Sequence, residues 1–187
     1  MSTGLASLIR HVALTLLVVL IVFLGVRVYQ TESGPDLHLW HTWTGSEMSA
    51  KALDKATFSQ YLAREEALFS HLKTGVTDKL KPDEQTPINR FYHNSRVWPP
   101  QFSPNGNRSY VLMPQGKPRG VAVLLHGLTD SPYSMKYVAK DYQQRGFIAI
   151  VPRLPGHGTA PGALTAVEWE QWLAASRLAV REATRLA

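Results

Sequence analysis

Two short segments hold residues whose types and spacing could support chemistry. His126-Gly127-Leu128-Thr129 follows an apolar run over residues 121–125, and Gly156-His157-Gly158 follows a second run over residues 147–151. An imidazole can act as a general base. A Gly-x-Gly turn after a strand is one feature of dinucleotide-binding folds. The segments therefore raise two possibilities, acid–base catalysis and nucleotide binding.

The second segment lacks the rest of a dinucleotide-binding motif. Pro161 occupies the position of the third glycine, and the next predicted helix begins only near Thr165. No helix N-terminus would then face a pyrophosphate. We therefore interpret this segment as a turn after a strand, and we expect no cofactor.

The sequence offers no recognisable nucleophile or metal site. Gly-x-Ser-x-Gly, the turn that carries the serine of many hydrolases, does not occur. Ser131, Ser134 and Ser176 fall at a predicted helix cap or on predicted helices. The chain has no cysteine, which excludes disulfides and thiolate metal sites. His38 and His41 lack a third ligand at a suitable spacing, so we predict no metal.

The elements around the first segment predict an α/β fold. The two apolar runs contain β-branched residues and are typical of strands covered on both faces. Between them, Ser131 and Pro132 begin a predicted helix that Gly146 ends. Its predicted inner side consists of Met135, Val138, Ala139 and Tyr142. Strand, helix and strand in about 30 residues indicate a βαβ unit with parallel strands.

Two further elements flank this unit. A strand is predicted over residues 108–113, followed by a turn over 114–118. After the second segment, Thr165 and Glu168 have the spacing of a capping box. The helix they begin carries a predicted inner stripe of Trp169, Trp172, Leu173, Ser176, Val180 and Ala183. It has no stop signal before Ala187, from which we expect a truncated domain.

The motifs resemble those of the α/β-hydrolases. His126-Gly127-Leu128-Thr129-Asp130-Ser131-Pro132, followed by Leu154-Pro155-Gly156-His157-Gly158, is similar to the carboxylesterase, monoacylglycerol lipase and serine-aminopeptidase-like group, over residues 108–187. The resemblance implies the N-terminal half of that sheet. It implies that the Leu128 backbone N–H serves the oxyanion hole, in a loop with His126, Gly127 and Thr129. It also implies that His126 is a structural residue of this loop, and that Gly156, His157 and Gly158 lie near the rim of the pocket.

In the family, the nucleophilic serine, the acid and the catalytic histidine follow later in the chain. We therefore expect an N-terminal fragment of a membrane-anchored serine hydrolase, inactive alone, whose complete form cleaves small-molecule or lipid esters, or amides, through an acyl-enzyme. The alternative is a non-catalytic single-pass membrane protein that keeps the βαβ unit as an interaction module.

The N-terminus predicts membrane attachment. Residues 11–26 carry no formal charge and lie between Arg10 and Arg27. Residues 9–29 are long enough for a spanning helix, and we predict a signal anchor over 1–30, with a cleaved secretory signal as the rival. Arg10 in the short tail favours a cytoplasmic N-terminus in the inner or plasma membrane, with the remainder periplasmic or extracellular.

The remaining sequence divides into three predicted parts. Residues 31–56 read as a juxtamembrane linker in which Trp40 and Trp43 would be interfacial anchors. Residues 57–107 form a helical extension: Thr57 and Gln60 make a capping box, Gly75 closes the helix, and Glu65 and Glu66 lie on a solvated face. Residues 108–187 form the partial hydrolase domain. The net charge of +6 comes from scattered basic residues, so we predict no nucleic-acid binding.

Overall fold

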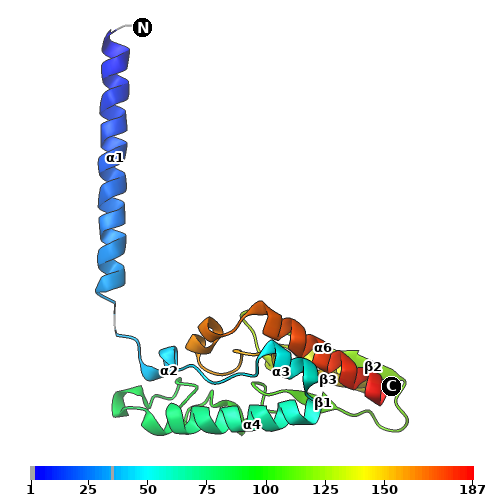
Figure 1. Ribbon diagram of the computed structural model, residues 1–187. Coiled ribbons are helices and arrows are strands. Elements are labelled where there is room, and N and C mark those ends of the chain that lie inside the picture. The colour runs from blue at the N-terminus through cyan, green and yellow to red at the C-terminus, as the bar shows by residue number, and fades with distance from the viewer. Residues whose placement is uncertain (1–2, 35) are drawn as a thin grey trace. The chain divides into compact units, whose positions relative to one another are not determined.

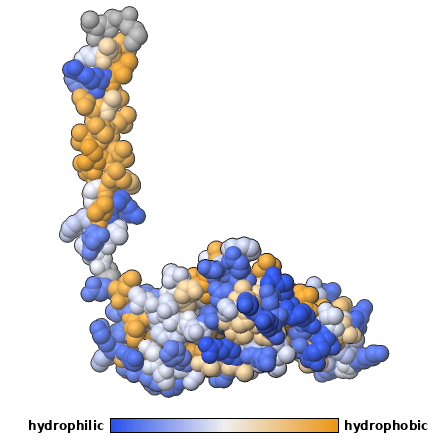
Figure 2. Space-filling model, in the orientation of Figure 1, coloured by the Kyte–Doolittle hydropathy of each residue, from blue (hydrophilic) through white to orange (hydrophobic). Residues whose placement is uncertain are grey.

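The computed structural model describes residues 3–34 and 36–187, and the chain divides into two compact units, residues 1–37 and 38–187. The first unit contains helix α1 (Thr3–Glu32). Residues 4–32 are long and apolar enough to cross a membrane, and a signal sequence would meet the same criteria. Its apolar side chains are exposed all around the helix, and Figure 2 shows them as a continuous band.

The second unit is built on a three-stranded sheet. Its strands are β1 (Tyr110–Leu112), β2 (Gly120–Val123) and β3 (Phe147–Val151), in the order β1-β3-β2. β2 runs parallel to β3, and α5 (Lys136–Gln144) connects the two, which confirms the predicted βαβ unit. β1 pairs antiparallel with β3, so the turn over residues 114–118 does not close a hairpin between β1 and β2.

Helices pack on both faces of β3. On one face, Ile148 and Ile150 pack with α3 (Ala50–Lys55), α4 (Phe58–Gly75) and α6 (Trp169–Leu186), which Figure 1 shows beside the sheet. On the other, Ala149 and Val151 pack with Ala139 of α5. Successive strand side chains point to opposite faces, and β3 is buried because both faces are covered. The sheet thus lies between two helical layers.

Two predicted burial patterns around the βαβ unit are wrong. β2 was expected to be covered on both faces but is only half-buried along its length, because it is an edge strand whose one partner among the described residues is β3. In α5 only Ala139 is fully buried. Val138 and Tyr142 are 45% and 37% exposed. Ala139 packs against Ala149 and Val151 of β3, and Met135 packs against the same cluster as predicted.

The start and the inner face of α6 also differ from the prediction. Thr165 lies in the 3-10 helix Pro161–Ala166, and Glu168 is the N-cap of α6, with Gln171 as its capping-box partner. The side packed against α3 and the sheet is formed by Ala174, Ala175, Leu178 and Ala179. Trp169 is 62% exposed, and Leu173 and Val180 are exposed as well. The alanines let the helix lie close to its neighbours. Of the predicted stripe, Trp172 and Ala183 do pack against this core, whereas Trp169, Leu173 and Val180 point outward.

The extension before the sheet is more ordered than a linker. Short helices α2 (Leu39–Thr42) and α3 lie within residues 31–56. The predicted capping box of α4 is confirmed: the Gln60 N–H donates to Thr57 Oγ1 at 3.2 Å, and the Thr57 N–H donates to Gln60 Oε1 at 2.9 Å. Short 3-10 helices follow at Thr77–Lys79, Pro82–Glu84, Pro99–Gln101 and, after β2, Pro132–Met135.

Trp43 and Gly75 take roles that the sequence did not predict. Trp43 is buried among Leu68, Leu72 and Phe91, so it packs in a core and is no interfacial anchor. Gly75 is the last residue of α4 and has no left-handed backbone conformation, so it is not the predicted cap. A Cβ atom at Gly75 would lie 2.6 Å from Trp43 Nε1. Glycine is therefore required by the close approach of the indole ring.

Candidate functional site

The segment His126–Thr129 leaves the end of β2 as a tight turn. The Asp130 N–H donates to the Gly127 carbonyl at 3.1 Å and closes the turn. Leu128 is 62% exposed. Its backbone N–H has no acceptor among the residues that the structure describes. A backbone donor without a partner, on an exposed turn, is available to a ligand oxygen.

His126 is buried beneath this turn and connects it to the segment after β3. Its Nε2 accepts the Leu154 N–H at 3.1 Å, and its Nδ1 lies 3.0 Å from the Gly127 carbonyl, to which only an N–H can donate. These contacts require a neutral ring with its proton on Nδ1. Burial lowers the pKa of His126, in agreement with the neutral form. Both ring nitrogens are occupied, so neither can take a proton from a substrate.

His157 holds the same turn from the other side. Its Nε2 lies 2.8 Å from the Leu128 carbonyl and its Nδ1 lies 3.1 Å from the Pro155 carbonyl. The sequence placed this residue at a pocket rim, but the side chain is buried. Its neighbour Gly158 does line a cavity of about 350 Å³. Leu128 is therefore held through its carbonyl, while its N–H, which belongs to the preceding peptide unit, has no partner among the described residues.

Aromatic packing reinforces this arrangement. The His157 ring meets the ring of His126 at a centroid distance of 4.8 Å and that of Trp172 at 5.5 Å, both edge to face. The Trp172 indole N–H donates to the Pro155 carbonyl at 2.9 Å. Trp172 of α6 thus packs against the loop that follows β3 and limits the movement of His157.

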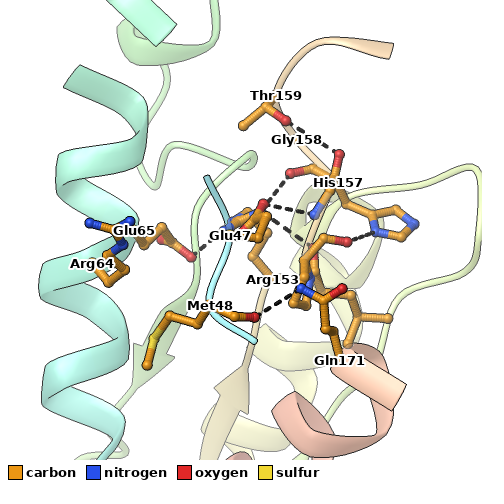
Figure 3. A network of polar contacts seen from close by, with 12 residues as sticks. Glu47, Met48, Arg64, Glu65, Arg153, His157, Gly158, Thr159 and Gln171 are labelled. Carbon is orange, nitrogen blue, oxygen red and sulfur yellow. Dashed lines mark hydrogen bonds and ion pairs between the residues drawn. The ribbon is translucent and has the colours of Figure 1, made fainter. Parts of the chain in front are cut away.

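A buried ion cluster, shown in Figure 3, anchors that loop to the N-terminal extension. The Arg153 guanidinium is fully buried and binds both oxygens of Glu47, at 2.7 and 2.9 Å. Its Nε donates to Glu65 Oε2 at 3.1 Å, and its Nη1 donates to the His157 carbonyl at 3.1 Å. Glu65 was predicted on a solvated face, and this is wrong. Its carboxylate is buried because it faces the opposite charge of Arg153.

Neighbouring groups complete the cluster. The Ser109 N–H donates to Glu65 at 2.9 Å, and the Ser109 hydroxyl donates to the same carboxylate at 2.7 Å. This hydroxyl also accepts the backbone N–H of Arg153. The Gly156 N–H donates to Glu47 Oε1 at 2.7 Å. Burial by itself would lower the pKa of Arg153, but Tyr61, Glu47 and Glu65 around the guanidinium raise it above its ordinary value. Burial raises the pKa of Tyr61, whose hydroxyl donates to the Arg153 carbonyl. Arg153 therefore stays charged.

The cluster was missed because its members are far apart in the sequence. Arg153 lies two residues after the end of the buried strand β3, and this position was the one local signal for a buried counter-ion. Its partners Glu47 and Glu65 come from the extension that precedes the hydrolase-like region. The conformation of the loop over residues 153–158 therefore depends on that extension.

The described residues contain no group of three or more His, Asp or Glu side chains that could hold a metal. His38 Nδ1 lies 3.1 Å from Glu84 Oε1, and the ring of His41 accepts the His38 N–H at 2.9 Å. The two rings are stacked on each other. Both histidines therefore have partners within the protein.

Comparison with known proteins gives one curated relative and a solved structure. No family model matches the chain. The thermostable monoacylglycerol lipase of Bacillus sp. (strain H-257) is 39% identical over 57 residues, which are 30% of this chain and 22% of the lipase. This match supports a relationship to the α/β-hydrolases.

A solved structure from the description of LipS and LipT, two metagenome-derived lipolytic enzymes, is also similar. It is 29% identical with a TM-score of 0.41, over 44% of this chain and 32% of that one. The α/β-hydrolase relationship rests on the sequence match and the motifs. The chain spans about a fifth of the curated lipase's length.

The neutral state of His126 predicts a dependence of stability on pH. Burial lowers the pKa of the folded-state ring, so the unfolded chain binds a proton near pH 6.5 and the folded chain only at lower pH. The free energy of unfolding should be constant for this group above about pH 6.5 and fall as the pH drops below it. Urea unfolding at pH 7.5 and 5.5 measures the difference.

Two variants isolate the contribution of this ring. His126→Gln keeps an acceptor for the Leu154 N–H but does not titrate, and it should reduce the difference between the two pH values. His93→Asn, at an exposed histidine, should leave the difference as in the parent chain. An unchanged pH dependence in His126→Gln would show that the buried ring does not control it.

Proposed function

We propose that the chain carries the oxyanion-loop half of a serine ester hydrolase, with the Leu128 backbone N–H as one of two donors to the tetrahedral intermediate. The observation that carries this proposal is the free Leu128 N–H on an exposed turn. The carbonyl of the same residue is held by buried His157. Preorganised backbone donors of this kind stabilise developing negative charge on an oxygen. Gly127 and Thr129 complete the turn, and His126 supports it from below.

The other functional parts of the proposed enzyme lie outside these 187 residues. The second oxyanion donor of such a hydrolase is the N–H of the residue after the nucleophile, and no Gly-x-Ser-x-Gly is present. We expect the complete protein to cleave small-molecule or lipid esters.

Helix α1 would anchor it in the inner or plasma membrane, with residues 38–187 on the periplasmic or extracellular side. Alkaline phosphatase fused after residue 187 should then be active, and a fusion active only in the cytoplasm would contradict this orientation.

The 187-residue chain alone is expected to show no ester turnover. Purified chain should neither hydrolyse p-nitrophenyl butyrate above the buffer rate nor react with a fluorophosphonate serine probe. The same assays should be applied to the product of the reading frame continued past codon 187. A continuation that encodes Gly-x-Ser-x-Gly should give a labelled serine and turnover. Turnover by the 187-residue chain, or a continuation without such a serine, would contradict the proposal.

One observation favours the alternative, a non-catalytic membrane protein with an interaction module. Trp169, Leu173 and Val180 expose apolar surface along α6. Exposed apolar surface of this kind often marks a protein contact. A stop codon at position 188, together with folded and monodisperse behaviour of the full chain, would favour this second function over the first.

A further inference from the structure

The cavity of about 350 Å³ beside Gly158 is separate from the oxyanion turn. Its wall comes mainly from α4 and from residues 90–108, and none of residues 126–129 is among the described residues that line it. Its volume lies at the lower end of the range of about 300–1,000 Å³ that is usual for small organic ligands. The cavity can therefore be considered as a second site, whose ligand is not bound by the turn.

Flat apolar groups form a large part of the wall. They are Phe69, Phe91, Trp98, Pro99 and Pro100. Phe91 is buried, and Phe69 and Trp98 are half-buried, so part of each of the latter two side chains faces open space. Aromatic rings pack favourably on such side chains when they are stacked or meet edge to face. The wall therefore suits a small ligand with a ring.

The charged side chains in the wall are mostly positive. Lys73, Arg90 and Arg108 face one carboxylate, that of Glu66. Two of these cations already have partners, because Arg108 binds Glu66 and Lys73 binds Asp78 at 2.8 Å. Arg90 forms no ion pair with any residue that the structure describes. Its charge is therefore the one in the described wall that a ligand could balance.

Arg90 is held at the cavity but keeps unused donors. Its Nη2 donates to the Gly158 carbonyl at 3.3 Å, and its Cζ lies 5.7 Å from the centroid of the Phe91 ring. A guanidinium has five N–H donors, so this single hydrogen bond leaves most of them free. Asp83 and Glu84 line the neighbouring cavity of about 820 Å³, to which Arg90 also contributes, but neither carboxylate pairs with it. A ligand carboxylate could bind the guanidinium through two parallel hydrogen bonds.

We infer that this cavity binds a small aromatic carboxylate. The carboxylate pairs with Arg90, and the ring lies against Trp98 and Pro99. The side-chain amide of Asn107, which also lines the cavity and makes no hydrogen bond to the described residues, offers a further donor. An inorganic anion would leave the apolar wall unused, and a neutral aromatic molecule would leave Arg90 without a counter-ion. The inference does not depend on the proposed function, because no residue of the oxyanion turn takes part.

Binding can be measured by calorimetry on the full chain in phosphatidylcholine nanodiscs, with empty nanodiscs as the blank. The main probe is 3-phenylpropionate, with an expected Kd below about 1 mM. Its amide, 3-phenylpropionamide, has the same ring without the charge and should bind at least tenfold more weakly. Acetate, which has the charge without the ring, should not displace the probe at equal concentration. The saturated analogue 3-cyclohexylpropionate should bind at least threefold more weakly, because its ring cannot stack on the indole.

Matched variants locate the site. Arg90→Met should weaken binding of 3-phenylpropionate at least tenfold and leave binding of the amide unchanged. Arg96→Met is the control, because Arg96 is also exposed and without an ion pair among the described residues but does not line the cavity. It should leave both Kd values unchanged. Trp98→Leu should weaken binding of the aromatic carboxylate at least threefold.

A second pair of variants keeps the test decisive if Arg90→Met does not fold. Ser70→Trp fills the cavity from an exposed position on α4, whereas Ala63→Trp makes a similar change on α4 outside the cavity. Only Ser70→Trp should weaken binding. Equal Kd values for the carboxylate and its amide would overturn the inference. So would equal losses in Arg90→Met and Arg96→Met, which would indicate general attraction of anions to a basic chain, or unchanged binding in a folded Ser70→Trp variant.

Discussion

Replacement of Arg153 by methionine is expected to lower the free energy of unfolding by about 3–5 kcal/mol, the usual cost of removing one partner from a buried ion pair. The guanidinium is fully buried and is the positive partner of both Glu47 and Glu65. Without it, two carboxylates remain out of water with only neutral donors such as Ser109. The change also removes the hydrogen bond from Arg153 to the His157 carbonyl.

Urea unfolding of the full chain in detergent micelles, followed by tryptophan fluorescence, measures this loss. Arg177→Met is the matched control, because Arg177 also binds a carboxylate, that of Asp54, with both side chains more than 40% exposed. Exposed ion pairs contribute at most about 1 kcal/mol to the free energy of unfolding. Equal losses for the two variants would show that the Arg153 cluster is not a buried ion pair in solution.

A triple variant tests the physical cause. Arg153→Met combined with Glu47→Gln and Glu65→Gln removes the positive charge and both negative charges together. It should recover part of the stability lost by Arg153→Met alone, since the main cost is the uncompensated charge. If the triple variant were less stable than Arg153→Met, the hydrogen bonds of the carboxylates would contribute more than their charge costs.

The parts that could be predicted from the sequence are those that short stretches determine. The apolar runs of β2 and β3 and the glycine after α5 encode strand, helix and strand locally. The Thr57 capping box needs only four residues. Gly146 has the left-handed φ of +88° that ends such a helix. These features depend on neighbours in the chain, so periodicity and capping chemistry identify them.

The parts that were missed depend on contacts between distant residues. Glu65 and Glu66 are adjacent on α4, and nothing local distinguishes the buried one from the exposed one. Only Arg153, 88 residues later, makes burial of Glu65 favourable. Likewise, Trp43 beside a predicted membrane helix resembles an interfacial anchor until Leu68 and Leu72 of α4 pack around it. The candidate turn over 126–129 could be predicted from its motif, but its support by His157 could not.

Substitution of Gly158 by alanine is expected to be the second most destabilising change, with a loss of about 3 kcal/mol or more in the free energy of unfolding. Gly158 has a left-handed φ of +73°, which costs an L-residue about 1–2 kcal/mol. A Cβ at this position would also lie 2.5 Å from the Asn107 carbonyl oxygen. Backbone cannot move as a flexible side chain does, so the contact adds a steric cost to the conformational one.

Gly116→Ala provides the matched control for this change. Gly116 has nearly the same φ, +77°, but a Cβ there would meet no atom within 4 Å. It should therefore show the conformational cost alone, about 1–2 kcal/mol, and the difference between the two variants measures the contact with Asn107. Because Gly158 follows His157, displacement of the loop should also loosen the Leu128 turn, seen as faster hydrogen exchange of the Asp130 N–H. Equal losses in the two variants, with unchanged exchange at Asp130, would mean that the loop is not packed against Asn107.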